Sequence, residues 1–374
     1  MTPAPARSGL ALQAGLLLVL VAAGYAAATI ASANLARAGI GIDFGFFFQQ
    51  AGFDIGDPLI AFGASDTYAR AFVVGLLNTL VLAVVAGALA TLVGVAVAIV
   101  LVSGNPLAEW VARAYVEAMR NLPKLVLLLV VYVVMVAGLP SVRASLHPLP
   151  GVFLSNRGLY LPAPDWDTGA LVRLAAMAGA ALAGALLAFS WRRARRDAAR
   201  PWLPIAAGLL AAGAVAVLFP PAWTVPELAG FDFAGGAFVA LPFIALVFTL
   251  TVYHGAQIAE VLRGGINAVP AGQWHAALAL GLTPWQRMAS VILPQVVRSV
   301  LPPMTNQYLN LLKNTSIGLA VGYTELMAVA GTTINQSLRS VEVMTVVMSV
   351  YLAIGLAIAI GMNHLNARLR LGLA

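Results

Sequence analysis

The sequence contains no cysteine and few charged residues, and each of these absences excludes a class of protein. Without cysteine the chain has no disulfide framework, no thiolate metal site and no thiol catalysis. Charged residues make up 9% of its 374 residues, whereas soluble domains contain about 25%. Hydrophobic residues reach 61%. The composition therefore predicts a membrane protein.

Motifs for nucleotide hydrolysis and for metal binding are missing as well. The chain has no G-x-x-x-x-G-K-[ST] loop, and neither of its two lysines, Lys124 and Lys313, follows a glycine. Its four histidines lie far apart in the sequence and form no H-E-x-x-H pair. We therefore expect no catalytic residue, no metal site and no cofactor in this chain. We expect His254 to be an interfacial or inter-helix hydrogen-bond partner.

Long apolar stretches are what the sequence has in abundance. A helix needs about 20 apolar residues to cross a bilayer. Eight stretches of this kind lie at residues 10–30, 71–102, 113–138, 170–190, 202–220, 237–258, 303–330 and 341–362. The predicted fold class is an all-α polytopic membrane protein with about eight transmembrane helices.

The first stretch has two interpretations. Arg7, the apolar run at 10–30 and the small residues at 31–33 resemble a signal peptide with its cleavage site. The apolar core of a signal peptide is about 7–15 residues long, and this run is longer. An uncleaved anchor is therefore favoured over a cleaved signal peptide.

The arginines indicate how the chain is oriented. A net charge of +7 also fits a nucleic-acid binder, but there is no soluble basic face to bind one. The basic residues instead gather at 191–196, in the segment 259–302 and in the tail after 362, which fall on one side of the membrane if there are eight spans. Because arginine-rich loops stay in the cytoplasm, we expect both termini there, membrane lipid around the spans and no nucleic acid.

The polar segment 259–302 cannot cross a bilayer, and its sequence predicts two short helices joined by a sharp corner. The first helix is expected over 271–280. It should end at Gly281 in the left-handed conformation, followed by the apolar Leu282.

The second helix of this loop has a start signal and a stop signal. Thr283 is expected to be its N-cap, with Pro284 at the first helical position and Gln286 completing a capping box. Pro294 is expected to end the helix near Leu293. Two helices and a sharp corner make a rigid structure, which must dock on a surface.

Two surfaces compete for this loop. A helix that lies on lipid carries a face of lysine or arginine, whereas the first helix has only one ionisable residue, His275. Its small Ala276 and Ala277 would let another protein approach the backbone closely. Docking on a partner protein is therefore favoured over lying on the membrane.

The spacing of the loop resembles the hallmark of permease subunits of bacterial ABC importers. That hallmark is Glu-Ala-Ala, three residues, glycine, nine residues, a branched apolar residue, one residue and Leu-Pro. The corresponding residues here are His275-Ala276-Ala277, Gly281, Val291 and Leu293-Pro294. Both spacings are kept, and a histidine stands where the family has its acid. The resemblance implies a type I ABC-importer permease core whose first loop helix is a coupling helix that inserts into a cytoplasmic ATPase.

The resemblance extends over nearly the whole chain. Segments similar to the general L-amino-acid branch of the polar amino-acid permeases lie at 34–56, 67–80, 115–123, 153–164 and 306–336. The residues that the resemblance assigns to ATPase coupling are Gly272, Gln273, His275, Ala276, Ala277, Leu280, Gly281, Leu282 and Pro294.

The resemblance also implies a domain organisation and a set of partners. An N-terminal span and an extracytoplasmic segment at 1–66 precede the permease domain at 67–374, which includes a branch-specific insertion at about 139–236 and the coupling loop at 259–302. The implied location is the bacterial inner membrane. The implied partners are a cytoplasmic ATPase dimer that holds ATP and Mg, a second permease subunit that is identical or similar, a periplasmic solute-binding protein, and an amino-acid substrate.

Polar side chains within the apolar spans are candidates for a substrate pathway. They are Asn121, Lys124, Asn310, Lys313, Asn314 and Glu325. Asn310, Asn314 and Glu325 are expected to share one helix face. Lys124 begins a stretch in which members of the resembled family usually have a glutamine and a run rich in phenylalanine and tryptophan. Such residues either line a pathway or join helices and subunits, and the sequence leaves both interpretations open.

Two other classes of protein fit the sequence less well. A secondary transporter carries its own energy coupling through inverted repeats and membrane-embedded acids, but the sequence has no convincing internal repeat and its spans are nearly free of carboxylates. A membrane enzyme needs clustered histidine, aspartate or glutamate, which is missing. The sequence therefore predicts the permease of an ATP-driven amino-acid importer, with secondary transport as the alternative.

Overall fold

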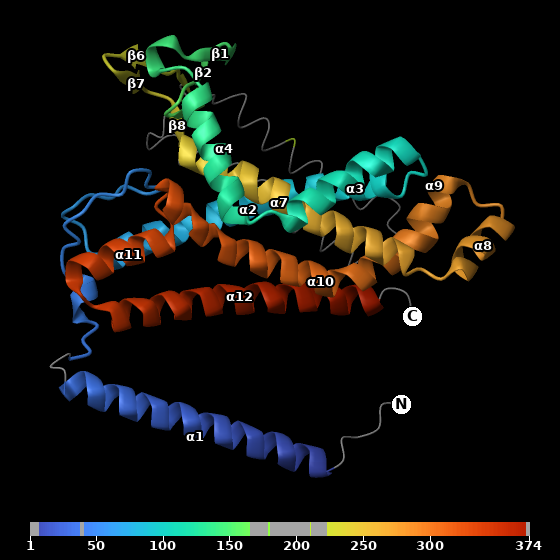
Figure 1. The fold of residues 1–374 in the computed structure, drawn as a ribbon, viewed down its shortest axis with the longest axis horizontal. Helices are drawn as coiled ribbons and strands as arrows, with labels where there is room; N and C mark the ends of the chain where they lie inside the picture. Colours follow the sequence, from blue (N-terminus) through green and yellow to red (C-terminus); the bar gives the residue numbers. More distant parts are fainter. Residues whose placement is uncertain (1–6, 38–40, 165–178, 180–209, 211–222, 372–374) are drawn as a thin grey trace.

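The computed structural model describes residues 7–37, 41–164, 179, 210 and 223–371. Figure 1 shows a bundle of long helices with a small group of strands at its upper side. Three helices of the described chain are each long and apolar enough to cross a membrane. They are α2 (Tyr68–Leu101), α7 (Leu241–Asn267) and α12 (Ser340–Leu371), and α10 (Leu293–Asn314) packs against α7 and α12.

A further membrane segment consists of two helices that meet at a sharp bend. α3 (Pro106–Asn121) and α4 (Lys124–Gly138) meet at 106°. The single continuous span expected at 113–138 is therefore wrong. The cause is Pro123, which lacks a backbone N–H and favours the extended conformation that Leu122 adopts.

A second bend follows α10. The helix tightens into a 3-10 turn, η4 (Thr315–Val321), which ends at Gly322 with a φ of +80°. α11 (Leu326–Ser337) then starts in a new direction, 54° from the segment that ends with η4. The continuous span expected at 303–330 is therefore wrong as well. If each bent pair is counted as one span, the described residues contain up to five candidate spans.

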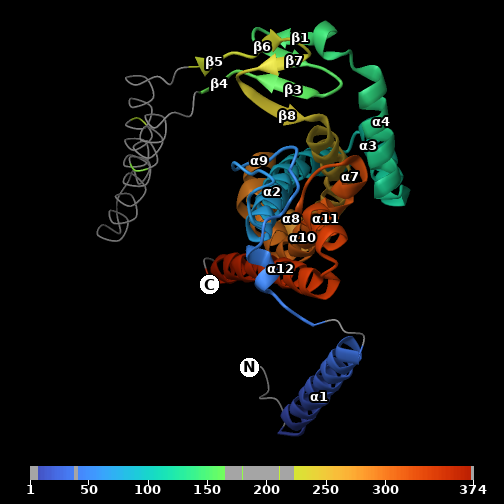
Figure 2. The ribbon, with the colours of Figure 1, turned by 90° about the vertical axis from the view of Figure 1, so that its left-hand side faces the viewer.

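The first expected span is the helix α1 (Arg7–Arg37), which stands apart from the bundle in Figures 1 and 2. The linker after it is tied to the bundle, because the Asp43 N–H donates to the buried Glu342 carboxylate at 3.0 Å. The spans expected at 170–190 and 202–220 lie outside the described residues, apart from the two single positions given above.

The most extensive helix packing among the described residues joins α2 and α7. It depends on two glycines at which the helix backbones approach closely. A Cβ at Gly94 would lie 2.5 Å from Ile258 Cγ2, and one at Gly255 would lie 2.8 Å from Val93 Cγ1. Carbon atoms prefer separations of about 3.5–4.0 Å. Glycine at both positions therefore permits the approach, as small residues do between membrane helices.

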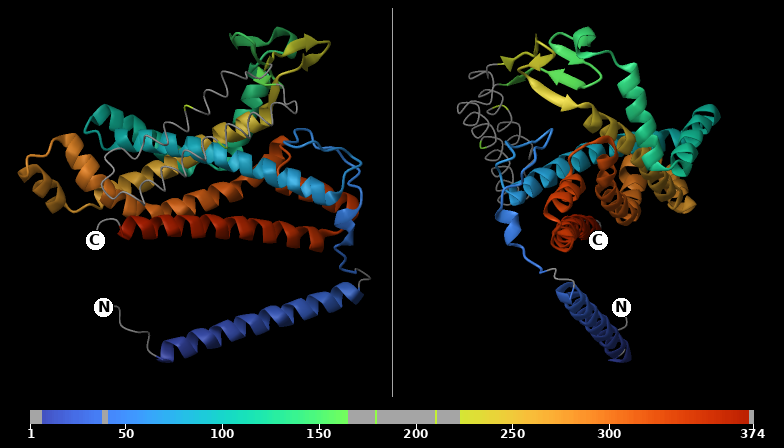
Figure 3. Two further views of the ribbon diagram at one scale, coloured as in Figure 1. Left: turned by 180° about the vertical axis from the view of Figure 1, so that it is seen from behind. Right: turned by 60° about the vertical axis from the view of Figure 1, so that its left-hand side comes forward.

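The insertion and the residues directly after it contain short antiparallel strands that were not predicted from the sequence, although the chain is mostly helical as predicted. The strands are β1 (Leu146–Leu149), β2 (Val152–Leu154), β3 (Gly158–Leu161), β4 (Ala163–Pro164), β5 (Trp223–Thr224), β6 (Glu227–Ala229), β7 (Asp232–Ala234) and β8 (Ala237–Ala240). One sheet has the order β1-β2-β3-β8, and β4–β5 and β6–β7 form two separate pairs. β8 runs directly into α7, so the strands sit at one end of that helix (Figure 3).

Asp232 fastens the β6–β7 pair to the sheet. Its carboxylate accepts a hydrogen bond from the Tyr160 hydroxyl on β3, and another from Arg157 Nη1 at 2.6 Å. Burial, together with the hydrogen bond to Asp232, raises the pKa of Tyr160 to about 12. Tyr160 therefore keeps its proton and remains a donor throughout the physiological pH range.

Candidate functional site

The loop between α7 and α10 holds the first candidate site. Its first helix is α8 (Ala271–Ala279), close to the predicted range. α8 ends in a Schellman motif, in which the Gly281 N–H donates to the Leu278 carbonyl at 2.9 Å and the Leu282 N–H donates to the Ala277 carbonyl at 3.2 Å. Gly281 has a φ of +69°. The predicted glycine stop is confirmed.

A capping box starts the next helix, α9 (Pro284–Gln286), as predicted. The Gln286 N–H donates to Thr283 Oγ1 at 3.3 Å, and the Thr283 N–H donates to Gln286 Oε1 at 2.9 Å. The chain then continues through a π-helical turn, η3 (Arg287–Ile292), into α10. Pro294 does not end the helix as expected, because it occupies the first turn of α10, where a missing N–H breaks no hydrogen bond.

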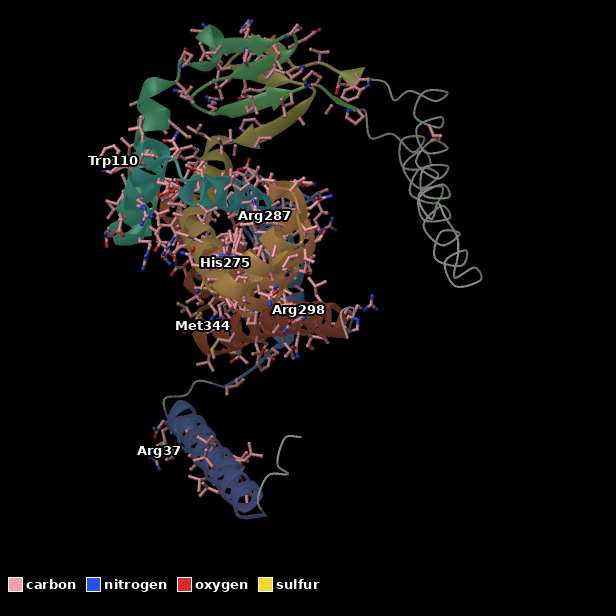
Figure 4. The ribbon with its side chains drawn as sticks, turned by 90° about the vertical axis from the view of Figure 1, so that its right-hand side faces the viewer. Arg37, Trp110, His275, Arg287, Arg298 and Met344 are labelled. Atoms are coloured by element: carbon pink, nitrogen blue, oxygen red, sulfur yellow. The ribbon has the colours of Figure 1, made fainter. Side chains whose placement is uncertain are left out.

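The residues expected to couple the chain to an ATPase are mostly exposed. The exposed ones are Gly272, Gln273, His275, Ala276, Leu280 and Gly281. Ala277, in contrast, is 2% exposed, so the expectation that it faces a partner is wrong. It lies one turn after Trp274, which packs against the core of the bundle. Figure 4 looks onto this end of the molecule, with His275 labelled.

Large apolar side chains stand exposed around the corner between α8 and α9. They are Leu278, Leu280 and Trp285, with 57%, 77% and 78% of their surface exposed. Exposed apolar side chains that gather in a polar loop indicate a protein interface. Leu278 and Trp285 were not among the residues predicted from the sequence. Their signal was the presence of leucine and tryptophan in a loop that belongs to no span.

The second candidate site lies between α4, α7 and α10, and we call its residues Lys124, His254 and Asn314 the Lys124 cluster. Lys124 Nζ donates to Asn314 Oδ1 at 2.8 Å, and Asn314 Nδ2 lies 3.0 Å from His254 Nε2. Nζ also lies 5.4 Å from the centre of the Tyr253 ring. His254 is 2% exposed. Its expected role as an inter-helix hydrogen-bond partner is confirmed.

The Lys124 cluster lies where both bent segments break. Lys124 is the first residue of α4, directly after Pro123, and Asn314 is the last residue of α10 before η4. Pro123 gives no side-chain hydrogen bond to the start of α4. Helix ends and polar side chains that meet inside a membrane protein form the kind of site at which transporters bind solutes. The arrangement fits a position on a substrate pathway.

Four of the predicted pathway residues lie outside the Lys124 cluster, and three of these are on the surface. The side chains are exposed at Asn121, Asn310 and Lys313. Lys313 is the residue before Asn314, yet only Asn314 turns its side chain to Lys124. The structure therefore brings together two of the predicted residues and adds His254 to them.

Glu325 has a structural role at the start of α11. Its carboxylate accepts hydrogen bonds from the Met327 N–H at 3.0 Å and the Ala328 N–H at 2.8 Å, and its side chain is fully buried. It therefore caps α11. The expectation that Glu325 continues the face of Asn310 and Asn314 is wrong, because α10 ends at Asn314.

Two residues of α2 hold the second break in place. Asn78 Nδ2 donates to the Thr324 carbonyl at 2.8 Å, and the Leu326 N–H donates to Thr79 Oγ1 at 3.0 Å. These bonds satisfy backbone groups that the broken helix leaves without an intrahelical partner. Asn78 and Thr79 were not among the residues predicted from the sequence. Adjacent polar residues in the middle of an apolar stretch were the signal that could have found them.

Comparison with protein families gives these two sites a context. Residues 90–371 match the family described as binding-protein-dependent transport system inner membrane component. The chain belongs to this family. The matched region contains the α8–α9 corner, both helix breaks and the Lys124 cluster.

Individual members of the family resemble the chain along most of its length. The general L-amino acid transport system permease protein AapQ of Rhizobium johnstonii is 38% identical over 90% of this chain and 86% of its own length. The putative amino-acid ABC transporter permease protein YhdX of Escherichia coli is 38% identical over 90% of this chain and 87% of its own length. The glutamate/glutamine/aspartate/asparagine transport system permease protein BztB of Rhodobacter capsulatus is 37% identical over 90% of this chain and 88% of its own length.

Membership in this family decides between the classes that the sequence left open. The chain is a multi-pass inner-membrane component of a binding-protein-dependent transport system, and its relatives are permease subunits. None of these relatives supports a secondary transporter. The predicted class of ABC-importer permease is confirmed.

Proposed function

We propose that this chain is the transmembrane permease subunit of an ATP-driven amino-acid importer and that α8 couples it to a separate ATPase dimer. The observation that carries the proposal is the α8–α9 corner, which is rigid, exposed and rich in apolar side chains. ATP and Mg belong to the ATPase subunits on this proposal. The permease itself catalyses no reaction.

α8 is the coupling helix on this proposal. His275, Ala276 and Leu280 form part of the face that meets the ATPase, since their side chains are exposed. Ala277 and Trp274 hold the opposite face against the permease. α8 begins directly after Pro270 and ends in the Schellman motif, and a short helix with defined ends is suited to transmit a displacement from one protein to another.

The proposal includes an orientation in the membrane. The start of α1, the end of α12 and the α8–α9 corner lie toward the same end of the molecule in Figure 1. If the corner meets a cytoplasmic ATPase, both termini are cytoplasmic. The strands of the insertion at 139–236 and the segment near 41–66 then lie outside the inner membrane, where a periplasmic binding protein docks.

The names of the relatives support the substrate class. AapQ is named for general L-amino acids, and BztB for glutamate, glutamine, aspartate and asparagine. We infer that a periplasmic binding protein delivers amino acids to this chain and to a second permease subunit, identical or similar. The substrate passes the Lys124 cluster, because this is where the broken helices bring polar groups together.

Reconstitution tests the proposed function. The purified permease is placed in liposomes with its ATPase and its second permease subunit, and a binding protein loaded with radiolabelled amino acid is added outside. We expect uptake only when ATP is enclosed. Uptake by the permease alone, driven by an ion gradient, would instead identify a secondary transporter and overturn the proposal.

A further inference from the structure

Lys124 is a cation inside the membrane bundle, and its polar partners in the described chain are neutral. Nζ is bonded to the amide oxygen of Asn314 and lies near the Tyr253 ring. The ion pairs of the described residues join arginines to acids, and none of them includes Lys124. Because a charge within a membrane span is costly, such residues are paired or functional. The missing counter-charge points to a ligand that supplies it.

The hydrogen bonds of the cluster fix which of its members is charged. An ammonium group only donates, so Asn314 must turn its oxygen toward Lys124 and its amino group toward His254. His254 Nε2 then accepts a hydrogen bond, which only an unprotonated nitrogen can do. His254 is therefore neutral in this arrangement, and Lys124 is the single charged member of the cluster.

Lys124 also keeps donors for a ligand. Its ammonium has three hydrogens, and the Asn314 oxygen takes one of them. The positive end of α4, a helix of 15 residues, begins at the same residue, and it adds to the attraction for an anion. Both effects act on a carboxylate that enters between α4 and α10.

The charge of the whole substrate decides which amino acids gain from this site. A neutral amino acid brings one carboxylate and one ammonium, so attraction and repulsion at Lys124 partly cancel. An acidic amino acid brings a second carboxylate on its side chain, away from its ammonium. A basic amino acid brings a second cation, which Lys124 repels.

We propose that Lys124 is a specificity-determining residue that favours acidic amino acids by pairing with their side-chain carboxylate as they cross the membrane. Asn314 is a positioning residue, since it holds the ammonium in place from the end of α10. The proposal rests on the proposed function and adds to it the substrate class and the residue that recognises it.

Uptake of two substrates of equal size tests the proposal. L-Glutamate and L-glutamine differ in the charge of the side chain, and each is supplied on saturated binding protein to the complete complex in liposomes. For Lys124→Gln we expect the ratio of glutamate uptake to glutamine uptake to fall about tenfold, which corresponds to the loss of one hydrogen bond between charged groups. Lys124→Arg keeps the cation and should keep most of the ratio.

A second variant tests the same point without removing the lysine. Asn314→Asp keeps the size of the side chain and places a permanent carboxylate against Nζ. We expect it to lower the ratio of glutamate to glutamine uptake and to raise L-lysine uptake relative to glutamine. This variant also keeps the test available if Lys124→Gln fails to assemble.

Lys313→Gln is the matched control, because it removes the other lysine of the chain at an exposed position outside the cluster. The ratio should stay as in the wild type. An unchanged ratio in Lys124→Gln and Asn314→Asp, with normal glutamine uptake, overturns the inference and leaves the proposed function intact. An equal fall of the ratio in Lys313→Gln also overturns it. Absence of ATP-dependent amino-acid uptake by the wild type overturns both.

Discussion

The two candidate sites are built in opposite ways. The hydrogen bonds of the Schellman motif and of the capping box at the α8–α9 corner join residues within five positions of each other, and one longer bond joins Gln273 to Gln295. The bonds of the Lys124 cluster join residues 190 and 60 positions apart. The turn and the caps of the corner are therefore set mainly by local bonds, while Trp274 and Ala277 hold α8 against the bundle. The cluster exists only while three membrane segments hold their relative positions, and this makes it suited to sense their movement.

The largest effect that separates the two regions is expected at Gly281. Gly281→Val places a β-branched residue at a φ of +69°, where even ordinary residues are strained by about 1–2 kcal/mol. The corner should lose its shape while the spans remain assembled. We expect ATP-dependent uptake to fall at least tenfold, with ATP hydrolysis no longer stimulated by loaded binding protein.

Gly281→Asn is the matched control for this prediction, since asparagine tolerates the left-handed conformation better than other residues do. It should keep most of the uptake. Wild-type uptake by Gly281→Val would contradict a coupling role for the corner.

The next largest effect is expected on protein stability, at the break between η4 and α11 that Thr79 supports. Thr79→Val leaves the buried Leu326 N–H without its acceptor, which costs about 1–3 kcal/mol. The melting temperature of the purified protein in detergent should fall. Thr345→Val is the control, because the Thr345 hydroxyl is exposed and bonds only to the carbonyl of Val341 on its own helix. Equal melting temperatures for the two variants would show that the break needs no support from α2.

The smallest effect is expected at the N-cap of α9. Thr283→Ala removes the oxygen that accepts the Gln286 N–H, a change worth about 1 kcal/mol. Amide hydrogen exchange at Gln286 and Arg287 should become faster while exchange in α7 and α12 stays the same. Thr283→Ser retains the oxygen and should retain the protection. Faster exchange throughout the spans would mean that the corner is not an independent structure.

The same difference explains what the sequence could predict. The roles of Gly281, Thr283 and Gln286 depend on residues close to them in the sequence. The turn and the capping box of the corner could therefore be predicted residue by residue. Pro294 was misplaced, because a proline marks the first turn of a helix as well as its end. Ala277 was assigned to the outer face because a small side chain suits a close contact with a partner. Its size does not show on which side of α8 it lies.

The membrane site was only partly within reach of sequence reasoning. Lys124 and Asn314 stood out as polar residues in apolar stretches, but no spacing rule relates them to His254 on another helix. Glu325 was assigned to the wrong face because the expected span ran through η4 without a break. Helical spacing places residues on one face only while the helix is continuous, and the spacing itself does not show where the helix ends.

The close contact of α2 with α7 has a mechanical consequence. Gly94 and Gly255 let each helix backbone reach the side chain of the other at positions where no Cβ would fit. Sliding of one helix along the other would drive Ile258 and Val93 into neighbouring turns that carry side chains. We therefore expect α2 and α7 to move together as one rigid unit. Relative movement of the membrane segments is then expected at the breaks beside Pro123 and Gly322, where the helices are already interrupted.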